Sequence, residues 1–229
     1  MCYLWALVPL FTLLMFFKVP IIPFGMEHGK ASVKKIFSNS MFRLFILVML
    51  CAGASEVAMA QWASLFAETG LGVSKTVGDL LGPCMFAFTM GIARLLFGKY
   101  GEKLNTFNVL SVAGVICVIG YLVSVFFQDP IISLLGCGIV GFGSAVMWPG
   151  ALSLAAKNCR NVGVALFGLL AMGGDIGCCL GPKVVAEVSS RFSVFDSPMK
   201  AGFLCAIIFP VILMISVNIL KKKSKQNVF

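Results

Sequence analysis

The chain has 229 residues, of which 59% are hydrophobic and 12% are charged. A soluble domain carries about 25% charged residues, so this composition excludes an ordinary soluble enzyme or binding domain and predicts an integral membrane protein. The net charge of +9 does not indicate nucleic-acid binding, because most basic residues fall on one side of the predicted membrane.

Seven apolar runs are long enough to cross a bilayer, which takes roughly 20 mostly apolar residues in a helix. These runs lack the alternating polarity of barrel strands, so we predict an all-α integral membrane protein. In chain order the runs cover residues 1–17, 42–67, 76–97, 105–127, 131–156, 161–188 and 199–220.

The first run, residues 1–17, lacks the charged start of a secretory signal, because no basic residue precedes Lys18. Residues 18–41 form the longest polar and basic stretch between runs, six closely spaced runs fill 42–220, and 221–229 are a basic tail. This layout predicts a transmembrane helix that ends a missing N-terminal bundle, then a central cytoplasmic loop, a six-helix bundle and a cytoplasmic tail. A mature seven-span protein is the alternative.

The basic residues are distributed unequally between the two sides of the membrane. With loops assigned to alternate sides, fourteen of the eighteen Lys and Arg residues fall on one side and four on the other. Positively charged loops stay in the cytoplasm, so we expect a multi-pass protein of the cell membrane with a cytoplasmic C-terminus. The fourteen are Lys18, Lys30, Lys34, Lys35, Arg43, Arg94, Lys99, Lys103, Lys157, Arg160, Lys221, Lys222, Lys223 and Lys225.

Two acidic residues interrupt the apolar runs. Glu56 lies in CAGASEVAMAQW (51–62), roughly 20 Å from the cytoplasmic side at 1.5 Å per residue. Asp175, in the sixth run, lies at a similar depth. Charged residues at mid-membrane cost at least about 2.5 kcal/mol and usually face a cavity or a partner. Arg94 and Lys183 lie near helix ends at other depths, so neither acid has an evident cationic partner.

A desolvated carboxylate without a partner tends to be protonated. We therefore expect Glu56 and Asp175 either to exchange protons or to meet a base from a missing half or a cationic solute. The alternative is a neutral acid that only hydrogen-bonds between helices. Gln61 is a further candidate for solute contact through a hydrogen bond, and the alternative is a hydrogen bond between helices. Trp148 is a candidate for stacking on the solute, and the alternative is a packing role.

Glycines recur at helix-packing spacing in three of the runs. Small residues let membrane helices approach closely, so these runs predict a tightly packed bundle. Pro83, Pro149 and Pro182 are expected to kink their helices. The glycines are Gly78 and Gly82 in the third run, Gly136, Gly138, Gly141 and Gly143 in the fifth, and Gly173, Gly177 and Gly181 in the sixth.

The loop RLLFGKYGEKLN (94–105) resembles the glycine-and-basic signature of the major facilitator superfamily, which lies between the second and third helices of each half. Lys99 matches its central basic residue, Gly101 its second glycine and Lys103 its closing basic residue. Arg94 stands where the signature has its first glycine, and Gly98 replaces its aspartate.

The segments 51–68, 144–156 and 174–182 resemble the seventh, tenth and eleventh helices of fucose-permease-like members of that superfamily. The resemblance covers essentially the whole chain and implies the C-terminal half of a twelve-span transporter. It implies alternating access of a small solute between two six-helix halves within membrane lipid, with a proton as the expected coupling ion.

Other functional classes have less support. A non-transporting assembly or regulatory protein, made from a truncated transporter gene, is the alternative to transport. An enzyme is not expected, because the single histidine, His28, lies in the central loop and no HExxH motif occurs. No CxxC spacing and no GxxxxGK[ST] motif occur either, so we expect no metal and no cofactor.

Overall fold

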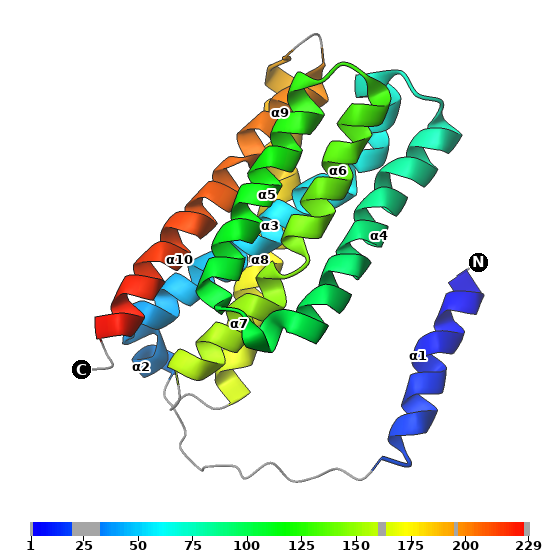
Figure 1. The fold of residues 1–229 in the computed structure, drawn as a ribbon. Helices are drawn as coiled ribbons and strands as arrows, with labels where there is room; N and C mark the ends of the chain where they lie inside the picture. Colours follow the sequence, from blue (N-terminus) through cyan, green and yellow to red (C-terminus); the bar gives the residue numbers. More distant parts are fainter. Residues whose placement is uncertain (1, 20–32, 160–163, 195–196, 227–229) are drawn as a thin grey trace. The chain divides into compact units, whose positions relative to one another are not determined.

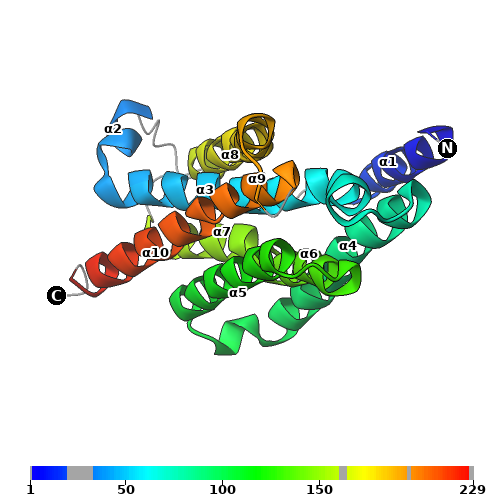
Figure 2. The same ribbon diagram turned by 90° about the horizontal axis from the view of Figure 1, so that it is seen from above.

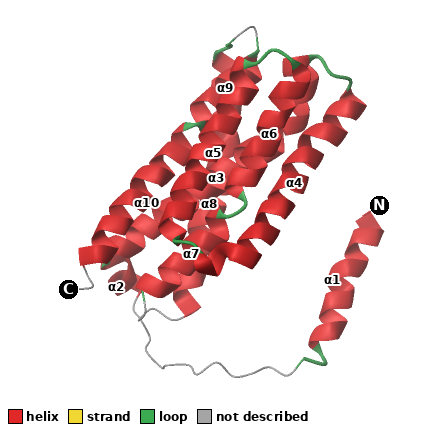
Figure 3. Cartoon of the chain, in the orientation of Figure 1, coloured by secondary structure: helices red, strands yellow, loops and turns green. Residues whose placement is uncertain are grey.

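The computed structural model describes residues 2–19, 33–159, 164–194 and 197–226, and nearly all of these residues are helical (Figure 1, Figure 3). The chain divides into two compact units, residues 1–30 and 31–229. In the first unit, α1 spans Cys2–Phe16 and is an apolar helix of 15 residues, as expected. That length is below the roughly 20 residues of a typical span, so its membrane crossing stays a prediction.

In the second unit, six helical stretches of the described residues are long and apolar enough to cross a membrane. They match the six predicted runs from residue 42 onward, so the predicted all-α membrane fold is confirmed. The elements of this unit are α2 (Val33–Ser38), α3 (Ser40–Leu65), η1 (Phe66–Gly70), α4 (Lys75–Tyr100), η2 (Gly101–Lys103), α5 (Thr106–Phe126), α6 (Pro130–Ser144), α7 (Met147–Asn158), α8 (Val164–Arg191), α9 (Pro198–Ala206) and α10 (Ile208–Gln226).

Two of the six stretches are interrupted three or four residues before a proline. α6 and α7 are separated at Ala145, whose carbonyl would clash with the ring of Pro149 in a continuous helix. α9 and α10 are separated at Ile207, and Pro210 lies four residues after Ala206, the last residue of α9. The kink expected at Pro149 is therefore present as a break in the helix.

Pro83 and Pro182 lie inside helices that run on without interruption, so the kinks expected at these two prolines stay predictions. α10 continues to Gln226, so residues 221–226 of the predicted tail are helical. Lysine is a good helix former, and its charge is favourable near a helix C-terminus, which explains why the helix continues past the apolar run.

α3 lies at the centre of the second unit, where it contacts α4, α6, α7, α8, α9 and α10 (Figure 2). Large side chains such as Phe45, Met49 and Met59 are fully buried on it. A helix that is apolar all round is buried, so the residues beside Glu56 lie in the core rather than on the lipid surface.

The glycines of α8 bring it into close contact with α3. A Cβ atom at Gly177 would overlap the backbone carbonyl of Leu50, and one at Gly181 would overlap the backbone of Ala54. Gly173 faces α3 in the same way. The packing role predicted for these three glycines is confirmed.

The glycines of α6 pack against two other helices. Gly136 and Gly143 lie against the backbone of α5, and Gly141 lies against the backbone of α4. The hydroxyl of Thr89 on α4 also donates a 2.6 Å hydrogen bond to the carbonyl of Gly138. These contacts join α4, α5 and α6 into one packed group.

Gly177→Ala is expected to destabilise the bundle by about 1–3 kcal/mol, the usual cost of overpacking a tight core. The new methyl group would overlap the Leu50 carbonyl, so α3 and α8 must separate. Thermal unfolding of the purified chain in detergent measures the effect. Gly168→Ala on the same helix is the control, because apart from its two chain neighbours and the backbone of its own helix no atom lies within 4 Å of the Cβ position at Gly168. Equal melting temperatures for the two variants would contradict the packing argument.

Candidate functional site

Glu56 lies on α3 and meets a cation of the neighbouring helix. Its side chain is 20% exposed, and its Oε1 lies 3.9 Å from Nη2 of Arg94 on α4. The Arg94 side chain is 52% exposed, so the pair sits at the edge of the packed core. The sequence predicted no cationic partner for Glu56 within the chain, and that prediction is wrong.

The error has a physical cause. Counted from Ser40 and from Tyr100, the ends of α3 and α4, Glu56 and Arg94 differ in height by about 15 Å at 1.5 Å per residue. Membrane helices are tilted by about 20° on average, and their ends need not lie at one level. The long arginine stem also carries its charge well away from its own Cα atom. Residue counting along upright helices omits all three effects.

The second carboxylate oxygen of Glu56 is in a different situation from the first. Oε2 is buried and has no hydrogen-bond partner among the residues that the structure describes. A buried polar atom without a partner costs about 1–3 kcal/mol, and more when it is charged. A proton on the carboxylate or a donor group from a solute would relieve this cost. One oxygen of the Glu56 carboxylate therefore lies near a cation, and the other has no hydrogen-bond partner among the described residues.

A buried tyrosine fixes the backbone beside Glu56. The hydroxyl of Tyr121 on α5 donates a 2.8 Å hydrogen bond to the carbonyl of Ser55, and the hydroxyl of Ser55 donates to the carbonyl of Cys51 at 2.7 Å. Tyr121 is fully buried. Sequence reasoning did not single it out, although a tyrosine in an apolar run is a usable signal, because its hydroxyl needs a partner when buried.

The second predicted acid, Asp175, lies on α8 and is exposed. The residue before it, Gly174, packs under the ring of Trp148 from α7, which occupies the space where a Cβ atom would stand. The structure thus brings Trp148 next to Gly174, the residue before Asp175 on α8.

A comparison with protein-family models matches residues 1–182 to the Major Facilitator Superfamily, about four fifths of the 229 residues. The chain belongs to the major facilitator superfamily. A search of the curated proteins gave no match to it. Facilitator-superfamily proteins are membrane transporters that move small solutes and are typically not enzymes, and the six apolar helices described above suit such a protein.

The facilitator loop signature predicted at 94–105 lies where α4 ends. Lys99 is in the last turn of α4, with its ammonium 5.3 Å from the centre of the Tyr100 ring. Gly101 and Lys103 are the first and last residues of η2. Arg94 lies inside α4 and pairs with Glu56, and its part in the loop signature stays a prediction.

Gln61 is exposed on α3, five residues after Glu56 and therefore about 140° around the helix from it. The interhelical hydrogen bond at this level comes from the next residue, because the indole of Trp62 donates to the carbonyl of Pro182 on α8 at 3.1 Å. Contact between Gln61 and a solute of this facilitator-superfamily protein stays a prediction.

Proposed function

We propose that the chain is the C-terminal half of a proton-coupled secondary transporter, a symporter in which Glu56 carries the proton and Arg94 the solute. The observation that supports this proposal is that the two oxygens of the Glu56 carboxylate have different surroundings. Its Oε1 lies 3.9 Å from the Arg94 guanidinium, and its buried Oε2 has no partner among the described residues.

The mechanism follows from the charges of this pair. While Glu56 is ionised, it attracts Arg94 and holds the guanidinium beside α3. When Glu56 gains a proton, the attraction is lost, and Oε2 no longer carries an unpaired charge. Arg94 has five N–H donors and is half exposed, so it can then bind acceptor atoms of a solute. Loss of the proton on the other side of the membrane restores the pair and displaces the solute.

This exchange favours a solute with oxygen acceptors, such as a sugar, an organic acid or an amino acid, because arginine binds carboxylates and other oxygens in a fork of parallel hydrogen bonds. Trp148, which packs against Gly174, and Asp175, the next residue along α8, are the proposed second side of the site. Gln61 is a further proposed contact.

A second six-helix half is part of the proposal. Solute sites in transporters of this kind lie between the two repeats, and one bundle supplies only one wall. α4 and α8 carry exposed apolar side chains such as Leu80, Phe88, Phe167 and Ile176, which a second bundle would cover.

Reconstitution tests the proposed function. Proteoliposomes contain either the chain alone or the chain together with the half that completes it, with an alkaline interior, and are offered radiolabelled sugars, organic acids and amino acids. We expect uptake that needs both halves and grows with the pH gradient. Robust uptake by the monomeric chain alone would refute the two-half architecture, and no uptake of any class by the complete pair would favour a non-transporting role.

We propose that the protein lies in the cell membrane with η2 and the end of α10 in the cytoplasm. Lys103 and Asp129 flank α5 (Thr106–Phe126), whose 21 residues span about 32 Å, close to the 30 Å of a hydrocarbon core. A cysteine at Asp129 is expected to react with an impermeant maleimide in intact cells, and one at Lys103 only after lysis. Labelling of both from outside would overturn this orientation.

A further inference from the structure

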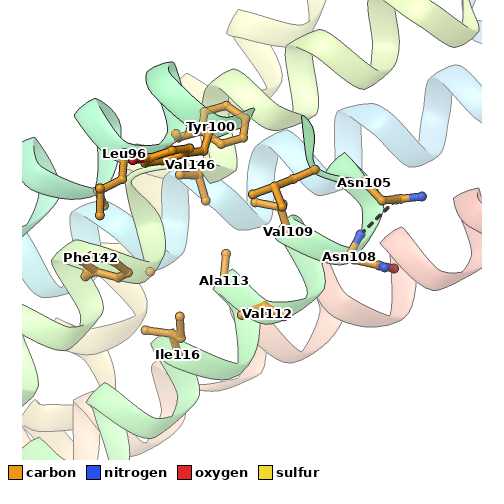
Figure 4. A pocket seen from close by; sticks show the side chains of 14 residues that line it. Leu96, Tyr100, Asn105, Asn108, Val109, Val112, Ala113, Ile116, Phe142 and Val146 are labelled. Atoms are coloured by element: carbon orange, nitrogen blue, oxygen red, sulfur yellow. Dashed lines mark hydrogen bonds between the residues drawn. The ribbon is translucent and has the colours of Figure 1, made fainter. Parts of the chain in front are cut away.

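A groove of about 500 Å³ runs between α4 and α5, with α6 at its base (Figure 4). One face of α4 lines it through Ala93, Leu96 and Tyr100, at the three- and four-residue spacing of a helix face. The facing stripe of α5 runs from Asn105 to Ile116. The groove is thus built from two adjacent helix faces that do not fill the space between them.

This groove is separate from the charge pair. Glu56 does not line it, and Arg94 lies about 100° around α4 from the lining residue Ala93. The lining of the groove is mostly apolar. The groove is open to the surroundings, since the lining residues Leu96 and Val112 are 44% and 56% exposed. A solute with several oxygen acceptors would find few partners there, so an apolar occupant is favoured.

The length and polarity of the groove suit one lipid chain. From Asn105 to Ile116 the stripe on α5 rises about 17 Å, close to the roughly 15 Å depth of one leaflet of the hydrocarbon core. Its polar side chains are Tyr100 at the end of α4, Asn105 in the cap before α5 and Asn108 in the first turn of α5 (Figure 4). An occupant with a polar head at this end and an apolar tail toward Ile116 matches the lining.

The polar end of the groove adjoins a basic cluster on α10. The ammonium of Lys221 donates a 2.7 Å hydrogen bond to Oδ1 of Asn108. Lys221, Lys222 and Lys225 line a second hollow of about 390 Å³. A lysine ammonium has three donors, and Lys221 uses one of them for Asn108. This cluster therefore offers positive charge and spare donors where the head of the occupant would lie.

We propose that the groove binds an anionic phospholipid, with one acyl chain between α4 and α5 and its phosphate at the α10 lysine cluster of Lys221, Lys222 and Lys225. Basic residues beside the membrane attract anionic headgroups, and the apolar groove next to them adds a place for the tail. The positive cluster makes a second copy of this strongly basic chain a poor occupant, because the two copies would place like charges together.

Native mass spectrometry of the full chain in detergent tests this site. The probes are palmitoyl-oleoyl phosphatidylglycerol and palmitoyl-oleoyl phosphatidylcholine, which share acyl chains and differ in net charge. We expect one phosphatidylglycerol to be retained in preference to phosphatidylcholine. Lys221→Gln is expected to reduce that preference about fivefold, the usual effect of one basic residue at an anionic surface, while Lys75→Gln at the far end of α4 leaves it unchanged.

A second pair of variants tests the tail site without touching charge. Val112→Trp is expected to fill the groove and abolish retention of the bound phosphatidylglycerol. Val115→Trp is the control, because Val115 is also an exposed valine of α5, but it does not line the groove. Retention unchanged by Val112→Trp, equal retention of both lipids, or a dimer mass that replaces the lipid adduct would each overturn the proposal. The readout involves no transport, so its outcome is independent of the proposed function.

Discussion

Glu56→Gln is expected to abolish accumulation driven by a pH gradient in the complete transporter. With one proton per solute and a gradient of one pH unit, coupling permits accumulation up to about tenfold, because one pH unit corresponds to 1.36 kcal/mol. The glutamine amide keeps the size of the side chain, but it carries no charge and cannot titrate. Accumulation should therefore fall to simple equilibration, while exchange of labelled for unlabelled solute continues.

Uptake into proteoliposomes with and without the gradient, together with counterflow exchange, measures both quantities. Glu68→Gln is the matched control, because Glu68 is an exposed acid at the outer end of the same helical stretch. Asp175→Asn is a companion variant with a milder expected effect, since Asp175 is exposed and pairs with no base in the proposed mechanism. Wild-type accumulation and wild-type pH dependence in Glu56→Gln would show that its carboxylate has a structural role only.

Much of the fold follows from local composition. The six spans of the second unit are visible as apolar runs because a bilayer demands about 20 apolar residues in succession. The packing of Gly177 and Gly181 was also predictable, since glycine at four-residue spacing has few other uses in a membrane helix. The break before Pro149 follows from the chemistry of proline itself.

The candidate site was predictable only in part. Glu56 stands out in sequence because charge is rare in an apolar run, but its partner does not. Arg94 lies 38 residues later on a neighbouring helix, and its contact depends on helix tilt and side-chain reach, neither of which a linear sequence reports. Tyr121 and Trp62 were not predicted as interhelical donors. The donor side chains are visible in the sequence, but the backbone carbonyls that they bond to carry no sequence signal.

The proposed lipid site between α4 and α5 shows a further limit of prediction from sequence. Its headgroup end depends on Lys221 reaching Asn108, two residues 113 positions apart. The sequence placed the α10 lysines in a cytoplasmic tail and explained them by topology alone. Because α10 stays helical to Gln226, Lys221, Lys222 and Lys225 line one hollow together. The basic residues that the sequence explains by topology therefore form a cluster in the structure.

Arg94→Gln is expected to weaken solute binding roughly 10- to 150-fold, because hydrogen bonds to charged groups contribute about 1.5–3 kcal/mol. Equilibrium binding of the transported solute to the complete transporter measures it. Arg94→Lys should recover only part of the affinity, since an ammonium lacks the planar fork of the guanidinium. Lys75→Gln, on the same helix and exposed, is the control and should bind as the wild type does.

The double variant Glu56→Gln, Arg94→Gln tests whether the two residues act as a pair. Residues of one charge network show coupling energies of about 0.5–3 kcal/mol, so the effects of the single variants on solute affinity should not add. The wild type must break the pair to bind solute, whereas Glu56→Gln frees Arg94 in advance and should bind solute at least as tightly at high pH. That gain should disappear when Arg94 is also replaced. Strict additivity, or a Glu56→Gln variant that loses affinity as pH rises just as the wild type does, would separate Arg94 from Glu56 and refute the exchange mechanism.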